Sequence, residues 1–582
     1  MTPTRWATLA MGLVAIAVVA VVARGGAVGS VAVTVAPDGG PQVPAGADAG
    51  YSNIEARDYV GPRACGECHA QNYARWQTTL HAAMNRRTDV SDGAVIGDFG
   101  GARLDYAGGH VSFERDGAAY VMTLVPPEGT ERRFRVTRTI GSRYLQEYVG
   151  VQLAGPEPAG DPVYTTEIRL PFGWWMRTRS WLHQQYYDSW YGAEYTADGR
   201  PAVDAYTPEK TPWASRCAWC HNTYPFALRA LRTLHTPPLG EGPEQYFDYR
   251  PAPGVVAARA SVIEHNLLPV DELVTVGVSC ESCHGGGREH AVEGKPIHFA
   301  PTSPTLRARA DAPSLEGGRK NHVLVITICA QCHSTPTPRW PDGAGQRNSS
   351  EALDLDAGAC LSQVKCTDCH DPHVAGPGSG APDSVKALGA CVACHGFLAA
   401  PRAQAEHSGH RPGSASCLDC HMPRIVQGVS DYTRSHRISS PTDPRMLSND
   451  APNACNLCHL DRSVKWTVAA LAAKWGQVVT PAAGAVLDDR PAGEAWRHAA
   501  SPALRAVAAA ATARQPRDVA RRALPALVAL LDDPIAYYRM RFLFAIEDTL
   551  GRRLTRSEYD PSAPPAERAA QVRALTAHPP RR

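Results

Sequence analysis

The hydrophobic pattern of this 582-residue chain changes twice along its length. Between residues 94 and 150, polar and apolar residues alternate on both sides of Asp116-Gly117, which is typical of antiparallel strands joined by a type I′ turn. Beyond residue 466, apolar positions recur at helical spacing in three segments joined by proline-containing turns: 501–516, 517–534 and 535–551. The pattern predicts a small antiparallel sheet early in the chain and a helical C-terminal region that frays from Asp560.

Three shorter stretches refine this picture. Apolar side chains fall at helical spacing between Tyr73 and Met84 and predict one helix that also carries His81. Residues 25–55 are rich in Ala, Gly, Pro and Val and predict a linker. Residues 164–195 are dense in aromatic side chains, which are typical either of ordinary core or of a surface that faces a cofactor or a neighbouring domain.

Sixteen of the seventeen cysteines fall in eight Cys-x-x-Cys-His motifs. At this spacing two thiols can each form a thioether to one porphyrin, and the adjacent histidine can bind its iron from below as the proximal ligand. The motif therefore predicts covalently attached haem c. The candidate thioether residues are Cys65, Cys68, Cys217, Cys220, Cys280, Cys283, Cys329, Cys332, Cys366, Cys369, Cys391, Cys394, Cys417, Cys420, Cys455 and Cys458. The candidate proximal ligands are His69, His221, His284, His333, His370, His395, His421 and His459.

Other chemistry that uses paired cysteines explains this pattern less well. A structural zinc site needs two further ligands at short range and has no need of a histidine after every pair. A disulfide framework would not repeat such close pairs, always before histidine, and a thioredoxin-like redox pair occurs once or twice in a chain. The remaining thiol, Cys360, is expected to be a buried spectator rather than a reactive group.

Haem attachment takes place outside the cytoplasm, so the chain is expected to be exported. An apolar run from Trp6 to Ala23, between Arg5 and Arg24, predicts that residues 1–24 are a signal peptide or an N-terminal membrane anchor. Both alternatives place the haems in the periplasm or another extracytoplasmic space. The formal net charge of +2 gives no reason to expect nucleic acid as a partner.

Each haem iron also needs a sixth ligand or leaves that position open. Histidines outside the motifs and outside the helical tail number twelve, which is enough for eight haems. His81 is too far along its predicted helix to reach the iron of its own motif and suits a neighbouring haem. His110 and His235 are expected at the surface. The predicted distal ligands are His81, His290, His322, His373, His410 and His436.

Several stretches resemble a family of octahaem cytochromes that join a cytochrome c-554 type domain to a doubled Cys-x-x-Cys-His region. The matching strings are CGECHAQNYARWQTTLHAAM, VSCESCHGGGREHA, VKCTDCHDPH, HSGHRPGSASCLDCHMP and APNACNLCHLDRSVKW. The resemblance covers residues 58–470 and implies periplasmic electron transfer through closely stacked haems, most of them with two histidine ligands. The helical tail resembles HEAT-type repeats.

These observations predict a mainly α and irregular multihaem fold with a small antiparallel β insertion and a HEAT-like tail. The predicted division, after the signal or anchor and the linker, is an N-terminal cytochrome domain with two haems (56–270), a six-haem region (271–465), a helical domain (466–559) and a tail (560–582).

Two functions remain open from the sequence. The first is an electron-transfer protein that serves redox partners such as cytochromes, quinol oxidases or reductases, docked on the helical tail. The second is an oxidoreductase acting on a small nitrogen or sulfur compound at one open haem. Known multihaem nitrite reductases use a Cys-x-x-Cys-Lys motif at the catalytic haem, and this chain has none, which favours electron transfer.

Overall fold

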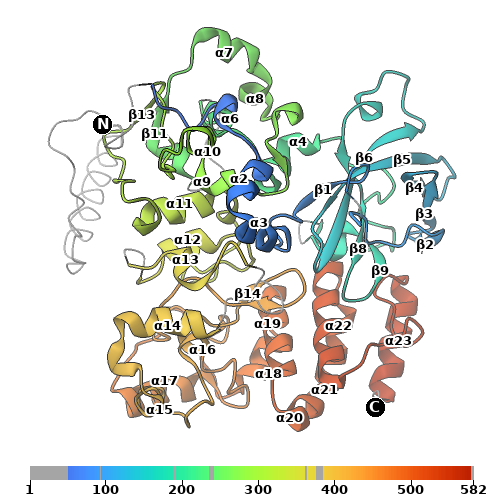
Figure 1. Cartoon of the computed structure of the whole chain (residues 1–582). Helices are drawn as coiled ribbons and strands as arrows, with labels where there is room; N and C mark the ends of the chain where they lie inside the picture. Colours follow the sequence, from blue (N-terminus) through green and yellow to red (C-terminus); the bar gives the residue numbers. More distant parts are fainter. Residues whose placement is uncertain are drawn as a thin grey trace, which may run out of the picture.

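The computed structural model describes residues 50–91, 93–188, 191–234, 242–360, 363–374 and 384–578. The predicted signal or anchor and most of the predicted linker lie outside these residues. Within them, no helix combines the length and the apolar character needed to span a bilayer. Figure 1 shows three regions: a group of short helices around α11, a β-sheet beside it, and C-terminal helices below the sheet.

The sheet is larger than the sequence predicts. Among the described residues it has nine strands, all paired antiparallel, in the order β2-β3-β4-β5-β6-β8-β9, with β1 on β5 and β7 on β6. The protein is therefore of mixed α/β class rather than mainly α with a small insertion. The strands are β1 (Asn85–Arg87), β2 (Ala102–Tyr106), β3 (Gly109–Asp116), β4 (Ala119–Val125), β5 (Arg132–Ile140), β6 (Leu145–Ala154), β7 (Ile168–Arg169), β8 (Phe172–Trp175) and β9 (Ser180–His183).

The predicted hairpin is present between β3 and β4. Asp116 pairs with Ala119, so the turn itself consists of Gly117 and Ala118. Gly117 has a φ of 60° and Ala118 is not in the positive-φ region. A positive φ at the first turn position alone defines type II′ rather than the predicted type I′, because type I′ requires it at both positions.

The C-terminal region is helical, as the apolar spacing predicts. Ser501 caps its third helix by accepting a hydrogen bond from the Leu504 amide. Pro525 falls in the segment predicted as one helix, 517–534, which is divided in two. The prediction of a frayed end is wrong for residues 565–577. The helices are α17 (Val464–Trp475), α18 (Ala492–Arg497), α19 (Pro502–Ala513), α20 (Arg517–Arg522), α21 (Leu524–Val528), α22 (Ala536–Leu550) and α23 (Pro565–Ala577).

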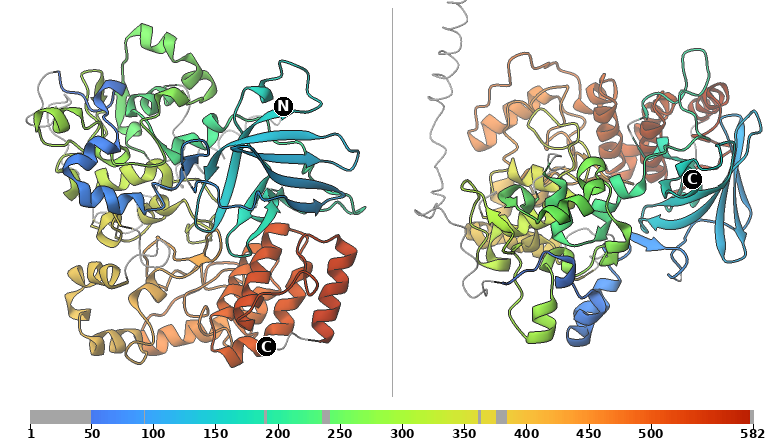
Figure 2. Two further views of the ribbon diagram at one scale, coloured as in Figure 1. Left: turned by 45° about the vertical axis from the view of Figure 1, so that its right-hand side comes forward. Right: turned by 90° about the horizontal axis from the view of Figure 1, so that it is seen from above.

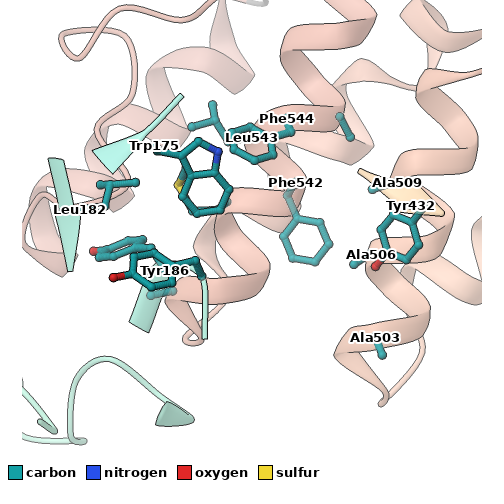
Figure 3. Close-up of a cluster of buried hydrophobic side chains, with 14 of the residues drawn as sticks. Trp175, Leu182, Tyr186, Tyr432, Ala503, Ala506, Ala509, Phe542, Leu543 and Phe544 are labelled. Atoms are coloured by element: carbon teal, nitrogen blue, oxygen red, sulfur yellow. The ribbon is translucent and has the colours of Figure 1, made fainter. Parts of the chain in front are cut away.

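The largest hydrophobic core joins the sheet to these helices, which lie side by side in both views of Figure 2. In Figure 3, Trp175 of β8 and Tyr186 beyond β9 lie beside α22, which contributes Phe542 and Phe544. Trp175 and Phe544 meet edge to face with ring centres 5.3 Å apart. The buried aromatic side chains described within 164–195 are therefore part of the core that joins the sheet to the C-terminal helices.

A buried carboxylate, Glu194, fastens the same interface. It forms ion pairs with Arg539 of α22 and Arg568 of α23. Its other oxygen accepts hydrogen bonds from the hydroxyls of Tyr106 and Tyr186. The side chain of Glu194 is 1% exposed, so water cannot replace these partners.

Replacing Glu194 with glutamine should destabilise the protein strongly. Removing one member of a buried ion pair leaves an uncompensated charge and costs about 3–5 kcal/mol. The matched control is Glu406→Gln, which breaks the exposed Arg402–Glu406 pair and should cost less than ~1 kcal/mol. The free energy of unfolding of each haem-loaded variant, measured by denaturant titration, tests this. Equal effects of the two substitutions would contradict it.

Two local predictions near the N-terminus are wrong. The linker does not extend to residue 55, because Tyr51 to Ile54 are buried and the Asn53 side chain donates to the carbonyls of His298 and Ala300. The predicted helix that carries His81 ends earlier, at Gln77. The hydroxyls of Thr78 and Thr79 donate to the carbonyls of its last turn, and this local bonding competes with continuation of the helix.

The remaining elements are short and connect or carry the cysteine motifs. The helices are α2 (Pro62–Cys68), α3 (Ala70–Gln77), α4 (Trp213–Arg216), α5 (Ala218–His221), α6 (Phe226–Arg232), α7 (Pro253–Ala258), α8 (Ala260–His265), α9 (Glu281–His284), α10 (Arg288–Glu293), α11 (His322–His333), α12 (Glu351–Asp356), α13 (Cys366–Cys369), α14 (Ser384–Cys394), α15 (Pro401–Ser408) and α16 (Cys417–His421). Three two-stranded ribbons pair β10 (Asn222–Thr223) with β12 (Thr275–Val276), β11 (Phe247–Tyr249) with β13 (Leu306–Ala308), and β14 (Val426–Gln427) with β15 (Tyr432–Thr433).

Candidate haem-binding sites

Cysteine motifs of this chain close as a single helical turn. In the motif of α2, for example, the His69 amide donates to the Cys65 carbonyl at 2.9 Å. The motifs that begin at Cys280, Cys366, Cys391 and Cys455 have the same bond, at 2.9–3.0 Å. Residues four apart lie on one face of a helical turn, so the first thiol and the histidine of a motif face the same side. This is the arrangement that lets one porphyrin be held by thiol and imidazole together.

Six motif histidines each face a second histidine ring. The distance between ring centres is nearly constant, although the planes of the rings differ in orientation. The pairs are His69–His290 (6.1 Å, 10°), His333–His81 (6.5 Å, 73°), His284–His373 (6.2 Å, 40°), His370–His436 (6.3 Å, 21°), His421–His407 (6.3 Å, 13°) and His459–His410 (6.1 Å, 30°).

This spacing fits one iron between two imidazoles. A histidine nitrogen lies ~2.0 Å from the metal it binds and the ring centre about 1.1 Å further on, so two rings on opposite sides of one ion are about 6.3 Å apart. Parallel rings that pack directly lie closer, such as the stacked pair Phe113–Trp181 at 3.6 Å, whereas the nearly parallel rings of His69–His290 and His421–His407 are 6.1 and 6.3 Å apart. The residues therefore fit a haem with two axial histidines at six positions.

Five of the six predicted distal histidines lie in these pairs: His81, His290, His373, His410 and His436. His322 has no second histidine ring beside it among the described residues. His407 faces His421 but is absent from the predicted set. It lies in the last turn of α15, and Gly409, with a φ of 66°, turns the chain so that His410 faces a different motif, that of His459. His110 lies on β3, and His235 is outside the described residues.

Two motif histidines, His221 and His395, have no second histidine ring beside them within the described ranges. His395 lies near the exposed ring of Phe397, at 6.0 Å. His221 is different, because its Nδ1 is buried without a hydrogen-bond partner. Burial and the charge of Arg169 lower the pKa of His221 to about 4. Arg169, on β7, forms ion pairs with Glu147 and Asp188.

Burial favours the metal-binding form of three of the paired imidazoles. Only neutral imidazole can bind a metal ion. Burial lowers the pKa of His81, His284 and His370 to about 4 in each case, with neighbouring histidines adding to the effect.

Hydrogen bonds at Nδ1 orient several of these rings. The acceptor is a backbone carbonyl for His290 (Lys295, 2.7 Å), His410 (Ser408, 2.7 Å) and His421 (Ser439, 2.9 Å). It is a carboxylate for His333, which lies 3.1 Å from Oε2 of Glu351. Burial raises the pKa of Glu351, but the bond to His333 and the charges of His333 and His436 outweigh it and lower that pKa to about 2.

Thiols of different motifs lie next to one another and connect the sites. Side-chain contacts join Cys65 to Cys280, Cys220 to Cys332 and Cys329 to Cys366. Weaker electrostatic interactions join Cys369 to Cys391, Cys391 to Cys417 and Cys420 to Cys455. The link between the two halves of this series runs through α11, which contacts α5, α9 and α13.

The glycines after His284 have a role that the sequence does not show. A Cβ on Gly286 would lie 2.8 Å from the Asp58 carbonyl oxygen, so glycine permits the close approach of the N-terminal segment. Glu281, within the same motif, accepts hydrogen bonds from the amides of Val60, Gly61 and Gly287. This carboxylate, which sequence reasoning missed, holds the first and third motifs together.

These sites define the class of the protein, which is a multihaem c-type cytochrome with covalently bound haem c. Comparison with known families agrees: residues 404–512 match cytochrome c552, and residues 64–96 match cytochrome c554 and c-prime.

Two solved structures are similar in part. The outer cell wall cytochrome OcwA has 14% sequence identity and a TM-score of 0.38, over 88% of this chain and 100% of that one. The octaheme sulfite reductase MccA of Wolinella succinogenes has 14% identity and a TM-score of 0.29, over 68% of this chain and 60% of that one. No curated protein matches the chain.

Proposed function

We propose that the protein is an exported octahaem cytochrome that carries electrons between redox partners along its haems. Each Cys-x-x-Cys-His motif would hold one haem, with its histidine as proximal ligand. The second histidine of each of the six pairs would be the distal ligand. Haem supplies a one-electron iron couple whose potential depends on axial ligands, burial and nearby charge.

The succession of neighbouring motif thiols is the observation that carries this proposal. Because thioether sulfurs sit at the porphyrin edge, the three pairs of thiols in side-chain contact imply neighbouring porphyrin edges, and the other three pairs are linked only by longer-range interaction. The series leads from Cys65 through Cys280 to α11, is joined there by Cys220, and continues through Cys366, Cys391 and Cys417 to Cys455. Each haem in the series would thus have a neighbouring haem to which it can pass an electron.

The setting of the protein follows from the same chemistry. We place it in the periplasm or another extracytoplasmic space, with residues 1–24 as a signal or anchor. Residues 56–270 and 271–465 would carry two and six haems, and the C-terminal helices, HEAT-like in sequence, would contact a cytochrome, quinol oxidase or reductase. The described surface of those helices that faces the sheet is already buried, so any such contact uses another face.

Intact mass and rapid reduction test the proposal. The exported protein should carry eight haems, counted by mass spectrometry of the intact chain. A substoichiometric pulse of reductant should be shared by all haems in one fast phase of absorbance change. Several slow, independent phases would contradict the proposed haem-to-haem transfer.

A second function, oxidation or reduction of a small nitrogen or sulfur compound at an open haem, is favoured at one position. His221 is buried, faces no second histidine within the described part of the chain, and lies near the cationic Arg169. The charge of Arg169 is offset by Glu147 and Asp188, but its Nε is buried without a hydrogen-bond partner and can donate to an oxygen of a bound anion.

Electron paramagnetic resonance separates the two functions. If the haem of His221 is open, the oxidised protein should show a high-spin signal that changes on addition of nitrite, hydroxylamine or sulfite. The Arg169→Gln variant should weaken binding of the anions and not of neutral hydroxylamine. A fully low-spin spectrum, unaffected by all three compounds, would exclude this second function.

A further inference from the structure

Glu351 is the more buried of two carboxylates that lie beside Nδ1 of a paired histidine among the described residues. It begins α12, which packs on α11, and its Oε2 is 3.1 Å from Nδ1 of His333. Its Oε1 accepts a hydrogen bond from the Ser349 amide at 2.9 Å. Hydrogen bonds thus hold both carboxylate oxygens of Glu351 in place beside the imidazole of His333.

The partners of the other axial histidines differ from Glu351. His290, His410 and His421 donate to neutral carbonyls, which carry no net charge. Asp371 lies 3.3 Å from His373, but its side chain is 49% exposed, compared with 27% for Glu351. Water screens an exposed charge more strongly, so Glu351 acts on its haem with the larger field.

The charge of Glu351 also reaches a second pair. The interaction between Glu351 and His436 acts in both directions, and His436 faces His370 in the next haem site. The charge of one carboxylate therefore acts on two candidate haem sites, most strongly on that of His333.

The haem held by Cys329 and Cys332 is the junction of the series. Cys332 contacts Cys220, Cys329 contacts Cys366, and both interact with Cys283. Electrons from the motif of Cys220 would cross this haem to reach the motifs of α13, α14 and α16, whereas Cys283 also interacts directly with Cys366.

We infer that Glu351 is a positioning residue that sets the potential of the junction haem, holding it below the potentials of the haems around it. A fixed negative charge stabilises ferric iron over ferrous iron, because ferric haem carries one more positive charge. The effect is largest at the haem of His333 and smaller at that of His370. Electrons would then reside mainly on the haems on either side of the junction haem. Transfer onto the junction haem would be uphill in free energy. The inference rests on the proposed function, because the potential of this haem matters only if electrons pass through it.

The junction haem can be followed by its own spectrum. Its imidazole planes are 73° apart, whereas the other five pairs lie at 10–40°. Nearly perpendicular ligand planes leave two iron d orbitals close in energy, and the low-spin signal is then far more anisotropic than for parallel planes. A potentiometric titration monitored by this signal reports on the haem of His333 alone.

The experiment compares Glu351→Gln with the unaltered, fully haem-loaded protein. The variant keeps the side-chain shape and loses the charge, so its junction haem should be reduced about tenfold more readily, or 59 mV for a one-electron couple. Glu351→Asp, which retains the charge, should restore most of the original value. Glu406→Gln, which removes an exposed carboxylate beside His407, should change nothing.

Three outcomes would overturn the inference: an unchanged titration in Glu351→Gln, an equal shift of all haems, or an equal shift in Glu351→Asp and Glu351→Gln. If the Glu351→Gln variant does not accumulate, the Glu351→Asp variant is the test. Its shorter side chain moves the charge away from His333, so the potential of the junction haem should shift in the same direction by a smaller amount. Failure of the proposed function is a separate result. It would show as slow sharing of electrons in the unaltered protein, which this equilibrium titration does not require.

Discussion

Replacing Cys366 and Cys369 with alanine should divide the haem series in two. The motif of α13 lies between Cys329 of α11 and Cys391 of α14, and the described residues offer no other motif that contacts both. The variant should lose one haem. Electrons delivered near the N-terminal motifs should then reach the haems of His395, His421 and His459 slower by orders of magnitude, because tunnelling decays steeply with distance.

A photoreductant attached at the exposed Val292→Cys position, on α10 beside His290, gives a defined entry point. The amplitude of the fast absorbance change then counts the haems within reach. In the variant it should fall to those of the first four motifs. The matched control is Cys65→Ala with Cys68→Ala, which also removes one haem but from the end of the series. The other seven haems should still be reduced when the photoreductant is attached beside one of them. Equal losses in both variants would contradict the proposed order.

Replacing His81 with alanine should convert one low-spin haem to high spin. His81 faces His333 at 6.5 Å, and its removal leaves that haem with five ligands. The strongly anisotropic signal should disappear from the oxidised spectrum, a high-spin signal of equal intensity should replace it, and the reduced variant should bind one additional carbon monoxide.

His322→Ala is the matched control, because His322 lies on the same helix as His333 but faces no histidine within the described chain. Its spectrum should be unchanged. A high-spin signal in His322→Ala, with none in His81→Ala, would show that the distal ligand of this haem is His322.

The contrast between these two residues explains which parts of the site are readable from the sequence. A motif is local: five consecutive residues form one helical turn, so its thiols and histidine can be recognised without the fold. A distal histidine comes from a distant segment. His322 begins the helix that His333 ends, and α11 itself holds the two about 16 Å apart at 1.5 Å per residue. For His322, closeness in sequence to a cysteine motif therefore does not predict a distal ligand.

The size of the sheet was hidden for a related reason. Parts of β3 and β5 alternate between buried and more exposed positions because one face meets the core, and the sequence predicts these strands. All four residues of β8 are buried, so the strand reads as an aromatic run without period. Its partner, α22, lies several hundred residues along the chain, and only the packing of Trp175 on Phe544 shows that the stretch is an interface.

The fastening of Glu194 to Arg539 and Arg568 has a consequence for biogenesis. Glu194 precedes every cysteine motif except the first, and Arg539 and Arg568 follow all of them. The contact can therefore form only after the last part of the chain has been synthesised. A contact of such long sequence separation forms late in folding. If the protein is exported as proposed, this contact cannot form until α22 and α23 have emerged, and during that interval the motif thiols would be accessible for attachment of haem.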